Sequence, residues 1–91
     1  MASLTIAHFF TQFYILGCQT EDGKNYWGND IHHEKVETLQ ACADLCSSTP
    51  GGLFWTWNKG NDKDCWVKGS DSGRIQDPGA VSGNRECGKK H

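Results

Sequence analysis

The chain has 91 residues, a formal net charge of −2 and 36% hydrophobic residues. This length suits one domain with a modest core. The nine lysines and arginines are interspersed with eleven acidic residues, so the sequence lacks the clustered positive charge that binds a nucleic-acid backbone. No segment has the roughly 20 consecutive apolar residues that a membrane span needs. The sequence therefore predicts a single domain that neither binds nucleic acid nor spans a membrane.

The first segment, residues 1–17, is apolar but interrupted by polar residues such as His8. No Lys or Arg precedes it, so the positively charged start of a secretory signal peptide is missing. Residues 4–16 are rich in Ile, Phe, Tyr and Thr, which favours an edge strand or an ordered lead-in. A segment added by cloning and a signal-peptide remnant are the alternatives.

The segment that follows Cys18 is mostly polar. Residues 19–25 have the composition of a turn. Tyr26–Ile31 predicts a short strand with a turn inside it, and residues 32–35 predict a polar link.

One helix is predicted, over residues 38–47. The Thr38 hydroxyl can accept a hydrogen bond from a first-turn amide and so cap the helix. The apolar residues recur at helical spacing and form one stripe: Leu39, Cys42, Leu45 and Cys46. The proline and glycines at 50–52 cannot continue the helix without cost.

The second half of the chain predicts strands separated by loops. Leu53–Trp57 is apolar and aromatic and predicts a buried strand, followed by a hairpin loop at Asn58–Asp64. Cys65–Lys68 predicts the returning strand, Gly69–Gly79 a long loop, and Ala80–Gly83 a last short strand. Short strands around a single helix indicate an α+β fold.

The tryptophans carry the clearest functional signal. Trp55 and Trp57 share one face of their strand, and we expect both of them and Trp66 to fill the core. Trp27 is expected to be partly exposed, and an exposed indole among polar residues suits sugar stacking or a protein interface. The candidate ligand-binding residues are Trp27, Asp30, His32, Lys59 and Lys68.

The sequence predicts no metal, no cofactor and no enzyme activity. Structural zinc sites usually have two short cysteine spacings, whereas this chain has one, from Cys42 to Cys46, and it lies in the predicted helix. The adjacent His32 and His33 would point to opposite faces of a strand. Paired catalytic carboxylates, a serine elbow and a glycine-rich phosphate loop are not found.

The cysteine density indicates disulfides and an oxidising compartment. The five cysteines are Cys18, Cys42, Cys46, Cys65 and Cys87. Cys42 and Cys46 lie four residues apart and face the same neighbour. Either could pair with Cys65, and the residues alone do not choose between the possible pairings.

An ordered set of segments resembles the PAN/apple module. The segments are Cys18, Tyr26–Ile31, Thr38–Cys46, Trp55–Asn58, Cys65–Lys68 and Val81–Cys87. The resemblance covers residues 18–87 and leaves residues 88–91 as a tail. It implies a curved antiparallel β-sheet that cradles one α-helix, and a role in binding proteins or carbohydrates within a larger extracellular chain.

The resemblance also implies disulfides Cys18–Cys87 and Cys42–Cys65. Gly52 stands where the family has its fourth cysteine, so Cys46 loses its expected partner. Cys46 is then a buried free thiol, or it competes with Cys42 for Cys65. The tryptophans and the missing cysteine make the chain look most like the PAN modules of apicomplexan microneme adhesins.

These observations predict an adhesion module of a secreted, extracellular protein, for which storage in a secretory organelle before release is a further expectation. Its partner would be a protein or glycan ligand on a host cell or in the matrix. One alternative is a structural module that joins neighbouring domains. Another is a heparin-like polyanion binder that uses Lys59, Lys63, Lys68 and Arg74.

Overall fold

The structure is a computed structural model that describes residues 14–15 and 18–88. The strands β1 (Tyr14–Ile15) and β2 (Cys18–Gln19) pair antiparallel in a small two-stranded sheet. The rest of the predicted lead-in, and the predicted tail after residue 88, lie outside the described residues.

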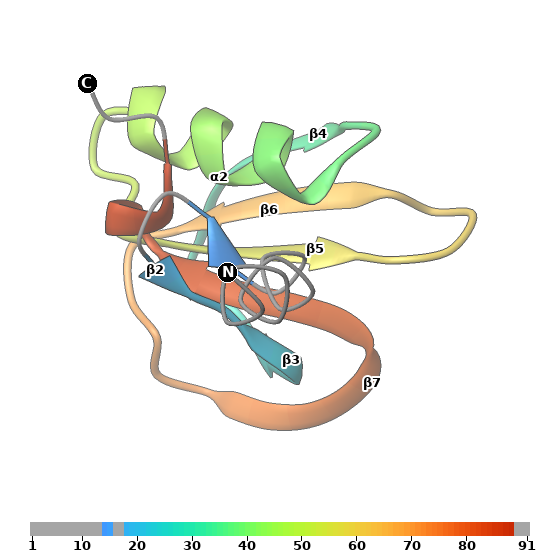
Figure 1. Ribbon diagram of the computed structural model, residues 1–91. Coiled ribbons are helices and arrows are strands. Elements are labelled where there is room, and N and C mark those ends of the chain that lie inside the picture. The colour runs from blue at the N-terminus through green and yellow to red at the C-terminus, as the bar shows by residue number, and fades with distance from the viewer. Residues whose placement is uncertain (1–13, 16–17, 89–91) are drawn as a thin grey trace, which may run out of the picture.

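The main sheet has five antiparallel strands in the order β3-β7-β5-β6-β4. Their bounds are β3 (Glu21–Tyr26), β4 (Asp30–Lys35), β5 (Phe54–Asn58), β6 (Asp64–Lys68) and β7 (Arg74–Asn84). The helix α2 (Leu39–Ser48) covers one face of this sheet, and the short 3-10 helix η2 (Arg85–Cys87) follows β7 (Figure 1). The expected α+β fold, with an antiparallel sheet cradling one helix, is confirmed for the described part of the chain.

The sheet must be strongly curved because its two edges are joined by a very short connection. The edge strands β3 and β4 are consecutive in the chain, with only residues 27–29 between them. Four spacings of about 4.8 Å separate the edges of a flat five-stranded sheet, about 19 Å in all, whereas the chain from Tyr26 to Asp30 reaches at most about 14 Å. The sheet therefore curls, and residues 27–29, here called the crossing segment, pass over the face opposite α2.

Hydrogen bonds hold the crossing segment to the loop between β6 and β7. The Trp27 amide donates to the Gly73 carbonyl at 3.0 Å, and the Gly69 amide donates to the Asn29 carbonyl at 3.0 Å. Gly28 and Asn29 both have positive φ, 89° and 59°, as a tight turn with two left-handed residues requires. The turn predicted inside 26–31 is therefore present, but the strands that flank it lie at opposite edges of the sheet.

Helix α2 begins where the sequence predicts. The Ala41 amide donates to the Thr38 hydroxyl at 3.0 Å, which caps the first turn. At the other end the Arg85 guanidinium donates to the carbonyls of Ser47 at 2.8 Å and Gly52 at 2.6 Å. It also donates to the Cys46 carbonyl at 3.2 Å. A cation at the carbonyl end of a helix offsets the helix dipole and satisfies groups that lack intrahelical partners.

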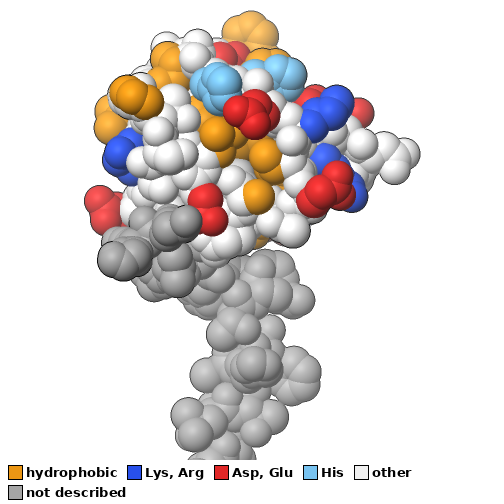
Figure 2. All heavy atoms as spheres, turned by 90° about the horizontal axis from the view of Figure 1, so that it is seen from above, with side chains coloured by type: hydrophobic (Ala, Val, Ile, Leu, Met, Phe, Trp, Pro, Cys, Tyr) orange, Lys and Arg blue, Asp and Glu red, His pale blue; other side chains and the backbone are white. Residues whose placement is uncertain are grey.

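The core lies between α2 and the face of the sheet that it covers. Its fully buried members include Trp55, Val67 and Cys87, and the Cys42–Cys65 disulfide joins the helix to β6 across it. Figure 2, a view from the side on which α2 lies, shows hydrophobic side chains in the middle of the surface with histidine and charged side chains around them. Half-buried apolar side chains pack around the rim of the core. These partly buried residues are Val36, Leu39, Leu45 and Trp57.

The pairing Cys42–Cys65 leaves Cys46 as a free, fully buried thiol. Burial raises the pKa of the Cys46 thiol to about 11. A Cβ at Gly52 would lie 2.7 Å from Val67 Cγ1 and 2.8 Å from the Cys46 carbonyl oxygen, so this position has no room for a side chain. The Arg85 guanidinium donates hydrogen bonds to the carbonyls of both Cys46 and Gly52, and so links these two positions without a disulfide.

The other implied disulfide stays a prediction. Cys87 is disulfide-bonded, but the side chain of Cys18 lies outside the described part of the structure.

Three sequence predictions of secondary structure are corrected. Residues 19–25, expected to form a turn, mostly belong to β3. Residues 32–35, expected to form a polar link, belong to β4, whose six residues are all exposed and so have no apolar alternation. Of the predicted loop 69–79, the residues from Arg74 onward belong to β7, and its pairing with β3 has a register shift between Gln76 and Val81.

Candidate ligand-binding pocket

The candidate site lies on the face of the sheet opposite α2. Successive residues of a strand point to opposite faces. In β6, Cys65 and Val67 belong to the core under α2, so Trp66 and Lys68 point to the other side. The crossing segment passes over this second face, and a pocket forms between it and β6.

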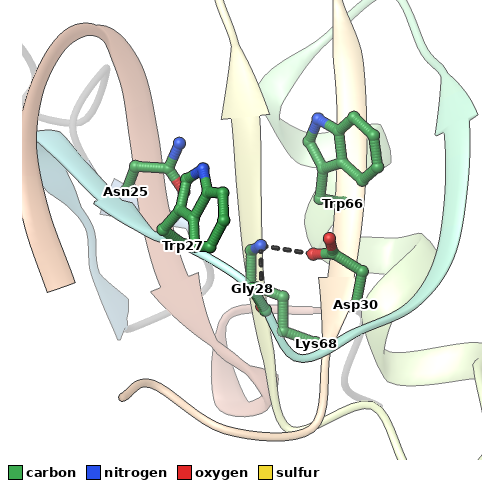
Figure 3. A pocket seen from close by; sticks show the side chains of 6 residues that line it. All are labelled: Asn25, Trp27, Gly28, Asp30, Trp66 and Lys68. Carbon is green, nitrogen blue, oxygen red and sulfur yellow. Dashed lines mark hydrogen bonds and ion pairs between the residues drawn. The ribbon is translucent and has the colours of Figure 1, made fainter. Parts of the chain in front are cut away.

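The pocket has a volume of about 350 Å³ and combines aromatic with charged side chains. Its lining residues are Asn25, Trp27, Gly28, Asp30, Trp66 and Lys68. In Figure 3 the indoles of Trp27 and Trp66 stand apart, with the Lys68–Asp30 pair between them. The pocket thus offers two aromatic surfaces and a central pair of opposite charges.

Lys68 is the buried charge of the pocket, since its side chain is only 3% exposed. Its ammonium donates to the Gly28 carbonyl at 3.2 Å and to the Asp30 carboxylate. A buried ammonium must have such partners, because removing it from water is costly. An ammonium has three donors, so one remains for a ligand, while the 38% exposed Asp30 side chain offers acceptor oxygens.

Trp27 is held by its backbone while its ring faces solvent. Its side chain is 70% exposed. Its amide bonds to Gly73, and a Cβ on Gly73 would lie 2.3 Å from the Trp27 carbonyl oxygen. Gly73 also has a φ of 82°, which favours glycine. This close approach fixes the backbone from which the exposed indole projects.

Trp66 is only half-buried, so its predicted place in the core is corrected. The indole Nε1–H donates to Asn58 Oδ1 at 3.0 Å. The imidazole of His33, on the neighbouring strand β4, stacks on the indole with ring centroids 3.9 Å apart and an interplanar angle of 13°. The alternation in 65–68 could have predicted that Trp66 lies on the same face as Lys68. Cys65 points into the core, so the residues at 66 and 68 point to the opposite face.

The structure brings together three of the five predicted ligand-binding residues. Trp27, Asp30 and Lys68 line the pocket, whereas His32 pairs with Glu34 at 2.7 Å on the exposed edge of the sheet. Lys59 pairs with an aspartate, Asp22, at 2.8 Å and also lies outside the pocket.

The residues proposed for polyanion binding do not form an unpaired basic surface. Each has an acidic partner within 4 Å: Lys59 with Asp22, Lys63 with Glu37, Lys68 with Asp30, and Arg74 with Glu21 and Asp71. Paired charges of this kind reduce the local positive potential on which polyanion binding depends.

Among residues 14–15 and 18–88, no three His, Cys, Asp or Glu side chains come together in a way that could hold a metal ion. In the same residues, no helix has the length and apolar character to cross a bilayer.

Residues 24–68 match the family model of the PAN domain. The matched stretch contains α2, the Cys42–Cys65 disulfide and all six residues that line the pocket. PAN domains are generally modules that bind proteins or carbohydrates within larger proteins. A search among curated proteins finds no match to the chain. The PAN match and the pocket therefore fall on the same part of the molecule.

Proposed function

We propose that this chain is an extracellular adhesion module that recognises a protein or carbohydrate ligand on a host cell or in the matrix. It would act as one part of a larger secreted protein. The observation that carries the proposal is the pocket, in which Trp27 and Trp66 stand on either side of the Lys68–Asp30 pair. PAN domains in general bind such ligands.

The chemistry of the pocket suits a ligand with an apolar face and a polar edge. Indole faces stack against sugar rings and aromatic or aliphatic side chains, and tryptophans are frequent energetic centres of interfaces. The ammonium of Lys68 and the carboxylate of Asp30 would donate to and accept from hydroxyl or amide groups. Because these two charges offset each other, the pocket favours a neutral group over a densely anionic one.

The proposed extracellular setting is supported by the disulfide chemistry. Disulfides such as Cys42–Cys65 persist in oxidising compartments. We place the module at residues 18–87, with Cys18–Cys87 as its second disulfide. The finer proposal, a relationship to apicomplexan microneme adhesins with storage in a secretory organelle, is supported by the tryptophans and by Gly52 at the cysteine position.

The oxidised 91-residue chain can be tested directly for binding. We would measure its retention on a glycan array and on cultured cells, beside the variants Trp27→Ala and Trp66→Ala. Leu53→Ala is the matched control, because Leu53 is also exposed, at 49%, but does not line the pocket. We expect retention to fall at least tenfold in both tryptophan variants and to stay unchanged in the control.

Two results would argue against the proposal. Equal retention of all four proteins would show that the pocket is not the binding site. No retention of the wild-type chain on any glycan or cell would favour the alternative, a structural module that joins neighbouring domains.

A further inference from the structure

We infer that His33 is a positioning residue of this pocket. Its ring holds the indole of Trp66, which forms one wall of the pocket, and makes the order of that indole depend on pH. The inference rests on the proposed function for its biological meaning. Its physical content concerns the free protein and needs no ligand.

The geometry of the stack carries the inference. The rings of His33 and Trp66 lie nearly parallel, with centroids 3.9 Å apart, and the two residues are direct cross-strand partners in β4 and β6. A stacked ring occupies one face of the indole, which leaves the other face to the pocket. Figure 3 shows β4 on the side of Trp66 away from Trp27, so the imidazole supports the wall from behind.

His33 is itself held from the neighbouring strand. Its Nε2 lies 3.1 Å from Asp64 Oδ1, and Lys35 Nζ lies 3.0 Å from the same oxygen. Asp64 and Lys35 are the charged side chains that face the imidazole, because the alternation of β4 turns His32 and Glu34 to the other side of the sheet. The bonds from His33 and Lys35 lower the pKa of the Asp64 carboxyl, which keeps it ionised in mild acid.

Protonation would strengthen both contacts of His33. Imidazole is the side chain that ordinarily gains its charge between pH 8 and pH 5. A charged imidazolium attracts the electron-rich face of an indole, and it also pairs with the ionised Asp64. The indole of Trp66 should therefore be held more firmly as the pH falls through this range.

The indole N–H signals of the 15N-labelled chain report this directly by NMR. We expect the Trp66 Nε1–H resonance to shift in one step between pH 8 and pH 5. Trp55 is the internal control, because its buried indole donates to the Asn84 carbonyl at 3.0 Å on the other face of the sheet. Its resonance should stay in place, and it also reports that the fold is intact.

Two variants separate positioning by the ring from the effect of its charge. His33→Phe keeps a flat ring and cannot be protonated, so Trp66 should remain ordered in 15N relaxation but lose its pH-dependent shift. His33→Ala removes the ring, so Trp66 should lose both the shift and its restricted motion, seen as a fall in the indole heteronuclear NOE.

Three outcomes would overturn the inference: a Trp66 resonance that does not move in wild type, an equal pH shift in His33→Phe, or unchanged Trp66 relaxation in His33→Ala. None of these depends on ligand binding. The proposed function can therefore fail in the retention assay while this inference holds, and the reverse is equally distinguishable.

Discussion

The two faces of the main sheet are built from the same strands but present different kinds of side chain. Toward α2, β5 and β6 present Trp55, Cys65 and Val67, which are fully buried beside the disulfide. Away from α2, β6 presents Trp66 and Lys68, which line a polar and aromatic pocket. Alternation along β6 thus places core residues and pocket residues next to one another in the sequence. Under the proposed function, substitutions in the core and substitutions of exposed pocket residues should have separable effects.

The largest effect is expected from removing the disulfide on the helix side of the sheet. Replacing both cysteines of the Cys42–Cys65 disulfide with alanine should lower the free energy of unfolding by about 3 kcal/mol, because the cross-link restricts the unfolded chain. Urea denaturation measures this difference. Cys46→Ala is the matched control, since it removes a buried sulfur without breaking a covalent link and should cost about 1 kcal/mol. Equal losses in the two proteins would contradict the assigned role of the disulfide.

A smaller effect is expected at the end of α2, where hydrogen bonds from Arg85 link the positions of Cys46 and Gly52 in place of a disulfide. Arg85→Ala removes bonds to the carbonyls of Cys46, Ser47 and Gly52. It should cost about 1–2 kcal/mol, since the guanidinium is partly open to water. Arg85→Lys keeps the charge near the helix end and should recover part of this loss. A melting temperature unchanged in Arg85→Ala would show that the contacts add nothing to stability.

The pH dependence of stability offers a test on the pocket side. The folded-state pKa of Asp64 is lowered by its bonds to His33 and Lys35. Its contribution is therefore fully present above the unfolded pKa of about 4 and is lost as the pH falls through the lower folded value. Melting scans from pH 6 to pH 2 should show less acid destabilisation in Asp64→Asn than in wild type. Parallel curves would mean that these bonds do not stabilise the fold.

The parts of the fold that the sequence predicted well have strong local signals. The Thr38 cap and the apolar stripe define the helix, and the aromatic run at 54–57 defines β5. The strand β4 escaped prediction because an exposed edge strand has no buried face and therefore no apolar alternation. The curvature of the sheet follows from strand order, which local patterns do not contain.

Only some of the residues that line the pocket could be predicted from the sequence. Trp27, Asp30 and Lys68 stood out as an aromatic residue and nearby charges in polar segments. Trp66 was assigned to the core from its residue type, although alternation with Cys65 turns it to the opposite face. His33 could not be linked to Trp66 from the sequence, because their stacking depends on the pairing of β4 with β6.

The separation of the two faces is tested most directly by Trp27→Ala, measured for both stability and retention on cells. Trp27 is 70% exposed and its ring lies outside the core, so the free energy of unfolding should change by no more than about 0.5 kcal/mol. Retention should fall at least tenfold, while Leu53→Ala retains wild-type values in both measurements. An unchanged retention, or a loss of binding that only accompanies a loss of stability, would contradict the account.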